Sequence, residues 1–258
     1  MIIGLCFKEF LINILYNMIS ILMPIYNGIE FINESVSSII IQTFNEWELI
    51  IGINGHPPDS DVFKDAKRYE TIDKRIKVVD LFPIKGKANS LNKMVELCKY
   101  NYIALLDVDD IWHYKKLEIQ TKFIINYDVV GSNCVWFGDI DGVVPKIPVY
   151  DISNFNFAEV NPIINSSSII KKQLCHWNEN GVEDYDMWIR LRKLNKRFYN
   201  CPEILVKHRI HKQSAFNSKG NNDKVTPLLL SHGIKKEENM NIFMGQVNNV
   251  QKINMTLF

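Results

Sequence analysis

Apolar runs rich in β-branched residues alternate with amphipathic stretches through the first half of the chain. The runs have the length of buried strands, and the stretches between them repeat apolar residues at the spacing of a helix face. The pattern predicts strands at 19–23, 47–53, 76–81 and a run ending at 107, with helices at 29–42, 61–72 and 88–99. This order of elements is typical of a mostly parallel sheet flanked by helices.

The second half of the chain is less regular and shows no internal repeat. The pattern there predicts a helix at 114–126, extended segments at 129–137 and 165–171, a helix at 184–194, and a polar loop at 217–223.

Polar residues follow three of the predicted strands. Asn27 lies in the turn after the first strand, Asn54 comes after the second, and Asp107 ends the fourth. Ligands in sheets of this kind collect at the carboxyl ends of the strands. We therefore expect one crevice to hold all three side chains.

Three carboxylates in four positions, Asp107, Asp109 and Asp110, follow the apolar run 102–106. Carboxylates so close repel one another unless a cation lies between them. Oxygen ligands suit Mg²⁺ or Mn²⁺, which commonly bind through one or two carboxylates together with substrate phosphates. The cluster therefore predicts a divalent metal with a phosphorylated ligand such as a nucleotide; taken alone, an acidic turn is the alternative interpretation.

Composition narrows the class of protein. A length of 258 residues with 47% hydrophobic residues fits one large domain. The 30 basic and 29 acidic residues give a net charge of +1, which supplies no electrostatic reason for a nucleic-acid partner. Five widely spaced cysteines without a CxxC pair predict neither a disulfide framework nor a zinc site, and they favour a reducing compartment.

The N-terminal segment is apolar, but Lys8, Glu9, Asn13 and Asn17 interrupt it. It is therefore shorter than the ~20 apolar residues of a spanning helix, and its charged pair argues against a signal peptide. Residues 1–17 are predicted to be an extension, for which an appended helix, a membrane-surface anchor and an overextended start remain open. We expect a cytoplasmic protein with at most peripheral membrane association.

Four segments carry a resemblance to a known family. They are Ser20-Ile-Leu-Met-Pro-Ile-Tyr-Asn-Gly28, Ser35 to Phe44 with its Gln-Thr-Phe end, Leu105-Leu-Asp-Val-Asp-Asp-Ile-Trp112 and Glu183-Asp-Tyr-Asp-Met-Trp-Ile-Arg-Leu191. In this order they resemble family 2 glycosyltransferases. The resemblance implies a single α/β domain at 18–215, with a GT-A-type, Rossmann-like, mixed and mostly parallel sheet flanked by helices, followed by a polar or helical tail at 216–258.

The resemblance also implies a donor site. In such enzymes the Pro-x-Tyr-Asn turn and the end of the second strand hold the base and ribose of a nucleotide sugar, which assigns this role to Pro24, Tyr26, Asn27 and Asn54. The family usually has Asp where this chain has Asn54; an Asn amide can still bind a base edge, and an ordinary turn is the alternative. Lys87 is implied to meet the diphosphate, with a solvated surface lysine as the alternative.

A metal is implied at the acidic cluster. The resemblance makes Asp109 the direct ligand of Mn²⁺ or Mg²⁺, and Asp107 a ribose contact or second metal contact. Asp110 is expected to orient the loop. His211 is implied to be a further metal ligand or to close over the diphosphate, whereas a packed or surface residue is the common role of a lone histidine. The metal would act as a Lewis acid and as a template.

The Glu-Asp segment supplies the implied chemistry. Asp184 would be the general base that deprotonates the acceptor hydroxyl, with Glu183 supporting it. Direct displacement with one base implies inversion at the anomeric carbon. Acidic residues are also favoured at any helix N-terminus, so helix capping is the alternative.

These residues together predict a metal-dependent inverting glycosyltransferase. It would move a sugar from a nucleotide diphosphate sugar, with UDP as the expected nucleotide, to a hydroxyl of a glycan, lipid or protein. Two other functions are alternatives. A phosphatase with Asp107 as nucleophile and Asp109 as acid fits poorly with the Glu183-Asp184 segment; a degenerate relative that binds nucleotide or glycan without turnover is the second.

Overall fold

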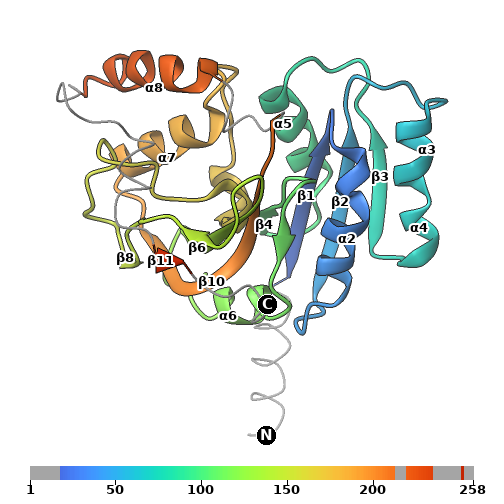
Figure 1. The fold of residues 1–258 in the computed structure, drawn as a ribbon, viewed down its shortest axis with the longest axis horizontal. Helices are drawn as coiled ribbons and strands as arrows, with labels where there is room; N and C mark the ends of the chain where they lie inside the picture. Colours follow the sequence, from blue (N-terminus) through green and yellow to red (C-terminus); the bar gives the residue numbers. More distant parts are fainter. Residues whose placement is uncertain (1–17, 213–218, 235–250, 253–258) are drawn as a thin grey trace, which may run out of the picture.

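The computed structural model describes residues 18–212, 219–234 and 251–252 (Figure 1). The predicted extension at 1–17 lies outside these residues. Within the described part of the chain, no helix is long and apolar enough to cross a membrane.

The first half forms a parallel half-sheet. Its strands are β1 (Ile19–Ile25), β2 (Trp47–Ile53), β3 (Ile76–Asp80) and β4 (Tyr102–Leu105), in the order β3-β2-β1-β4. β2 is buried along its whole length, as expected for a parallel strand covered on both faces. The apolar runs form strands here because each can bury both of its faces.

Helices cover the two faces of this half-sheet. They are η1 (Ile29–Phe31), α2 (Ile32–Ile40), α3 (Asp61–Lys67), α4 (Tyr69–Ile72) and α5 (Lys87–Leu97). The core contains Ile21 of β1 with Val36 of α2 on one face, and Leu22 of β1 with Leu91 of α5 on the other. Neighbouring residues of one strand therefore face different helices, and the helices fix the strand ends that form the site.

The second half extends the same sheet in the order β4-β9-β6-β10-β5. Its elements are β5 (Ile111–Trp112), α6 (Lys116–Gln120), β6 (Val129–Gly138), β7 (Val143–Val144), β8 (Tyr150–Asp151), η2 (Asn165–Ser167), β9 (Ile169–Lys171), η3 (Lys172–Leu174), α7 (Glu183–Lys193), β10 (Phe198–Ile210), α8 (Lys219–Ser231) and β11 (Gln251–Lys252). β10 runs parallel to β6, whereas β9 runs antiparallel to β4 and β6. The long pairings are parallel and the antiparallel ones short, which confirms the predicted mixed, mostly parallel α/β class.

Three predicted elements differ from the structure. The helix expected at 114–126 is only α6, and turns follow it to residue 126. The extended segment expected at 165–171 begins as η2, because the hydroxyls of Ser167 and Ser168 donate to the carbonyls of Ile164 and Asn165 at 2.8 Å. The loop expected at 217–223 is interrupted at residue 219, where α8 begins.

The sequence pattern also missed β10, the longest strand of the described chain. Its pairing with β6 shifts register between Cys201 and Ile204 and again between Ile204 and Val206. These irregularities, next to Pro202, break the alternation of apolar and polar positions by which a strand is recognised.

Candidate active site

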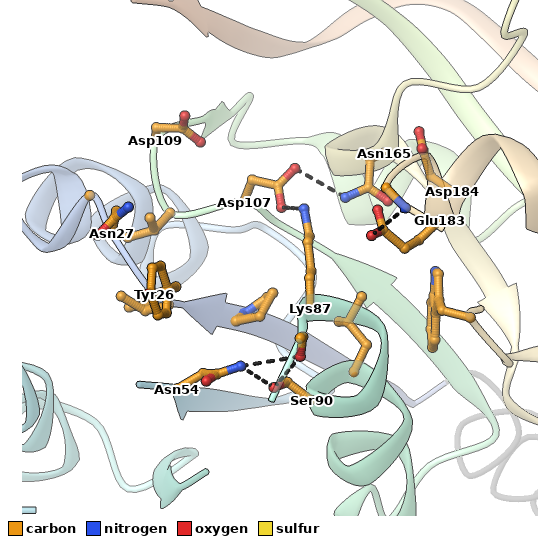
Figure 2. A pocket seen from close by; sticks show the side chains of 18 of the residues that line it. Tyr26, Asn27, Asn54, Lys87, Ser90, Asp107, Asp109, Asn165, Glu183 and Asp184 are labelled. Atoms are coloured by element: carbon orange, nitrogen blue, oxygen red, sulfur yellow. Dashed lines mark hydrogen bonds and ion pairs between the residues drawn. The ribbon is translucent and has the colours of Figure 1, made fainter. Parts of the chain in front are cut away.

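A cavity of about 1020 Å³ lies at the carboxyl ends of β1, β2 and β4. All the predicted site residues line it: Pro24, Tyr26, Asn27, Asn54, Lys87, Asp107, Asp109, Glu183, Asp184 and His211. Figure 2 shows Tyr26, Asn27 and Asn54 at one end of this cavity and Glu183 and Asp184 at the other. The fold therefore brings the predicted residues together, while their individual roles stay predictions.

The turn after β1 is held by the loop after β2. The ring of Tyr26 lies against Gly55, where a Cβ would collide with it, and Gly55 has a φ of 76° that favours glycine. His56 Nε2 donates to the carbonyl of Tyr26 at 2.6 Å. Tyr26 is 62% exposed at the cavity mouth. An exposed aromatic face on a fixed turn is suited to stacking on a flat ring.

Asn54 is buried and its amide orientation is fixed. Its Nδ2 donates to the carbonyl of Gly86 at 3.2 Å and to the hydroxyl of Ser90. Because a carbonyl can only accept, the amide nitrogen must face Gly86, and the oxygen of Asn54 points away from Ser90 in Figure 2. Asn54 thus ties β2 to the start of α5 and retains one acceptor.

Lys87 and Asp107 form an ion pair in the middle of the cavity. Lys87 Nζ donates to Asp107 Oδ1 at 2.8 Å, and Asn165 Nδ2 donates to Asp107 Oδ2 at 3.0 Å. Burial opposes the charge on Asp107, but Lys87 and Asn165 outweigh it and hold the pKa of Asp107 below its usual value. Burial opposes the charge on Lys87 too, but Asp107 and the carboxylates of α7 raise its pKa.

Asp109 lies beyond this ion pair, on the side of the cavity where Tyr26 and Asn27 lie (Figure 2). Its Oδ2 is 3.0 Å from His211 Nε2. Burial, together with the charges of Asp110 and Asp107, raises the pKa of Asp109. Its negative charge is therefore poorly compensated by the protein alone.

Asp110 is directed away from the cavity and organises the loop. Its carboxylate is buried, 3.1 Å from His208 Nδ1, and accepts the backbone N–H of Arg209 at 2.8 Å. These bonds join the Asp-x-Asp-Asp turn to β10. They agree with the orienting role expected of Asp110.

Asp184 stands in the first turn of α7. Asn161 Nδ2 donates to its Oδ2 at 3.1 Å. Burial raises the pKa of Asp184, and the N–H of Tyr185 and the charge of Lys87 only partly offset this. Neighbouring Glu183 accepts the backbone N–H of Gly181 at 3.2 Å and so fixes the turn into the helix.

The sequence reasoning missed several residues of the site. Asn161 donates to Asp184 and Asn165 donates to Asp107. Trp177 lines the cavity. Asn92 exchanges hydrogen bonds with the backbone N–H and carbonyl of Trp177, at 3.0 and 2.8 Å. None lies in a motif that carries chemistry, and only the fold shows that Asn92 and Trp177 meet.

The donor set at Asp109 fits a hard or borderline cation. Within the described residues no three His, Cys, Asp or Glu side chains converge as a complete metal cage. Mg²⁺ and Mn²⁺ do not need one, because they commonly bind one or two carboxylates plus substrate phosphates. A cation would also relieve the raised pKa of Asp109. Asp109, with His211 beside it, fits such an ion.

Solved structures share the fold. TarS 1–349 of S. aureus, in complex with UDP-GlcNAc, superposes with a TM-score of 0.66 at 15% identity, covering 82% of this chain and 64% of that chain. The mannosyltransferase PcManGT of Pyrobaculum calidifontis, in complex with GDP-Man and Mn²⁺, also has a TM-score of 0.66, at 13% identity, covering 89% and 68%. The fold is that of the GT-A glycosyltransferases.

Sequence relatives then place the chain in a family. Residues 20–198 match Glycosyl transferase family 2. The chain is 29% identical over 215 residues to the O-antigen biosynthesis glycosyltransferase WbnJ of Escherichia coli, covering 78% of this chain and 83% of the relative. It is 28% identical over 214 residues to the UDP-Glc:alpha-D-GlcNAc-diphosphoundecaprenol beta-1,3-glucosyltransferase WfgD of Escherichia coli, covering 78% and 81%. The protein belongs to glycosyltransferase family 2.

Proposed function

We propose that the protein is a metal-dependent, inverting glycosyltransferase that uses a nucleotide diphosphate sugar, with UDP as the nucleotide. The observation that carries this proposal is the division of one cavity by the Lys87–Asp107 pair, with Asp109 on one side and Asp184 on the other (Figure 2). A donor diphosphate and an acceptor hydroxyl can thus meet different carboxylates in the same space.

The donor would lie along the ends of β1 and β2. Tyr26 would stack on the base, and the fixed oxygen of Asn54 would accept a ring N–H, which uracil offers. Pro24 and Asn27 would complete the base and ribose contacts, and Asp107 would accept from the ribose. Lys87 would balance the negative charge of the diphosphate.

The metal would be held by Asp109, with His211 and Asp107 as further candidates, and would be Mn²⁺ or Mg²⁺. When bound, it supplies Lewis-acid stabilisation of the departing nucleoside diphosphate. A relative in fold, PcManGT, is described with GDP-Man and Mn²⁺, which supports this choice.

Asp184 would act as general base. Its raised pKa brings Asp184 closer to the working pH, where a general base is most effective. Asn161 orients one of its carboxylate oxygens by donating a hydrogen bond to it. The acceptor oxygen loses its proton to Asp184, forms the new bond to the anomeric carbon, and the nucleoside diphosphate leaves with the electrons of the old bond. Attack opposite the leaving group inverts the anomeric configuration.

The acceptor would carry a hydroxyl on a glycan, a lipid or a protein. The name of WfgD describes a sugar on a diphospho-lipid as its acceptor, which supports the first two classes.

The test is release of nucleoside diphosphate from a panel of nucleotide sugars, with Mn²⁺, with Mg²⁺ and with chelator. We expect metal-dependent release from a UDP-sugar. Metal-dependent binding without release from any donor, with acceptors supplied, would instead support a relative that binds without turnover.

A further inference from the structure

An apolar wall closes the cavity beside Asp184. It is formed by Ile84 before α5, Trp177 and Val182 before α7, and Val225 on α8, all of which line the cavity. The same four side chains belong to one apolar cluster that includes Leu91. None is needed to bind a nucleotide or to move a proton, so the mechanism leaves this wall without a role.

Hydrogen bonds fix the position of Trp177 in this wall. Asn92 holds the backbone of Trp177 by two hydrogen bonds, and the indole N–H of Trp177 is buried without a hydrogen-bond partner. Burying a polar N–H unpaired costs free energy. Because this N–H is closed off, the part of the indole that lines the cavity is carbon, which keeps the wall apolar.

Helix α8 supplies Val225 and lies beyond the family match, which ends at residue 198. Leu228 and Leu229 bury α8 in the apolar cluster, and the side chain of Lys224 lies against Gly181. The part of the wall on α8 is therefore a feature of this chain that the family match does not describe.

Asp186 fastens α8 to the segment that carries Asp184. His232 Nε2, just after α8, lies 2.9 Å from Asp186 Oδ1. Arg190 Nε and Asn178 Nδ2 both donate to Asp186 Oδ2 at 2.8 Å. One buried carboxylate thus joins α7, the loop before it and α8, so that Val225 keeps a defined position relative to Asp184.

We propose that this wall is an acceptor subsite for an apolar aglycone, and that the acceptor is a sugar carried on a lipid chain. We assign the occupant to the acceptor because Val182 of the wall directly precedes Glu183 and Asp184, the residue that would deprotonate the accepting hydroxyl, whereas the base would lie at Tyr26 and Asn54. Aliphatic side chains beside one indole favour an alkyl chain, since apolar burial is proportional to the apolar area removed from water. This inference rests on the proposed function for the identity of the reacting end.

The experiment compares hexyl β-glucoside with methyl β-glucoside, which differ only in the aglycone. Dissociation constants are measured by ligand-observed NMR titration on the full chain, below the concentration at which the hexyl compound forms micelles. Burying two or three methylenes predicts roughly tenfold tighter binding of the hexyl glucoside, or more. In Val225→Ser we expect this preference to fall to less than about threefold.

Leu230→Ser is the matched control, because Leu230 is on the same helix but 59% exposed and outside the cavity lining. It should retain the hexyl preference. Thermal melts of both variants establish that they are folded. Equal binding of the two glucosides by the unaltered protein, or a hexyl preference that survives Val225→Ser, would overturn the proposal.

The two proposals fail separately. If the unaltered protein shows no hexyl preference but turns over a nucleotide sugar, the subsite alone is refuted. A hexyl preference that depends on Val225, in a protein that turns over no nucleotide sugar, would refute the proposed function and leave an apolar glycoside site.

Discussion

Lys87 Nζ lies 2.8 Å from Asp107 Oδ1, and this pair joins the first turn of α5 to the loop after β4. Asp107 also accepts from Asn165, so its charge is compensated within the protein. Asp109, whose charge is not compensated in this way, is the more available ligand for a cation. The two carboxylates of the Asp-x-Asp motif therefore have different tasks: Asp107 binds Lys87, and Asp109 remains available to a cation.

Lys87→Met removes the cation and leaves the half-buried Asp107 without its main partner. We expect transfer to fall by roughly 10- to 100-fold, the cost of one lost charge-assisted hydrogen bond. Steady-state kinetics measures this. Lys93→Met is the control, because Lys93 is on the same helix and pairs with Glu96 at the surface. Full activity of Lys87→Met would contradict the role given to the pair.

Asn54→Asp restores the residue usual in the family but should destabilise this protein. The carboxylate would face the carbonyl of Gly86, to which the amide now donates. We expect a loss of about 1–3 kcal/mol in the free energy of unfolding, measured by denaturant titration at pH 7. Asn54→Ala breaks the same bond without adding charge and should cost less. A variant Asn54→Asp as stable as the parent would refute the amide orientation described.

The pair of His208 and Asp110 predicts a pH-dependent stability. Burial lowers the pKa of His208, but the Asp110 carboxylate outweighs burial and raises it to about 9. A group whose pKa is higher in the folded state stabilises fully below its unfolded pKa of about 6.5 and loses this contribution as the pH rises through 9. The contribution is on the order of 3 kcal/mol.

Thermal melting of the parent and of His208→Gln, in chelator, checks this. The difference in stability should be largest near pH 6 and shrink up to about pH 9.5. A difference that is constant over this range would show that His208 titrates no differently in the folded protein.

Asp109→Asn should remove the cation site while preserving the shape of the side chain. We expect Mn²⁺ affinity in the presence of UDP to fall by at least about tenfold, as measured by electron paramagnetic resonance. Because the pKa of Asp109 is raised, Mn²⁺ affinity of the parent should increase with pH as this carboxyl deprotonates. Asp141→Asn, in an exposed loop, serves as control. Equal Mn²⁺ binding by both variants would exclude Asp109 as the ligand.

The parts of the fold that the sequence predicts are those with local causes. β1, β2 and β3 follow from short apolar runs whose neighbours in the sheet are also near in sequence, and the turns after them place Asn27 and Asn54 at one edge. Periodicity failed where tertiary contacts decide. β10 contains Pro202 and two register shifts, so its alternation is lost, although it pairs with β6 over most of its length.

The candidate site also contains residues that the sequence predicts and residues that only the fold brings together. Asp109 and Asp184 stand in segments with a recognisable pattern, and the cavity contains both. Asn165 and Asn161 lie in a loop without such a pattern and meet their aspartates across 58 and 23 residues of sequence. Val225 belongs to a helix in a segment predicted to be a polar or helical tail. Their importance depends on where the chain brings them, which single-sequence patterns do not encode.

The most direct test of the proposed mechanism is the variant Asp184→Asn, in which transfer and donor binding are measured separately. We expect transfer to the acceptor to fall by roughly 10²- to 10⁴-fold, because the general base is lost, while the affinity for the nucleotide sugar stays within about threefold. In the parent, transfer should rise with pH through the raised pKa of Asp184, and this acid limb should disappear in the variant. Transfer at the parental rate by Asp184→Asn, with the acid limb unchanged, would show that Asp184 is not the general base.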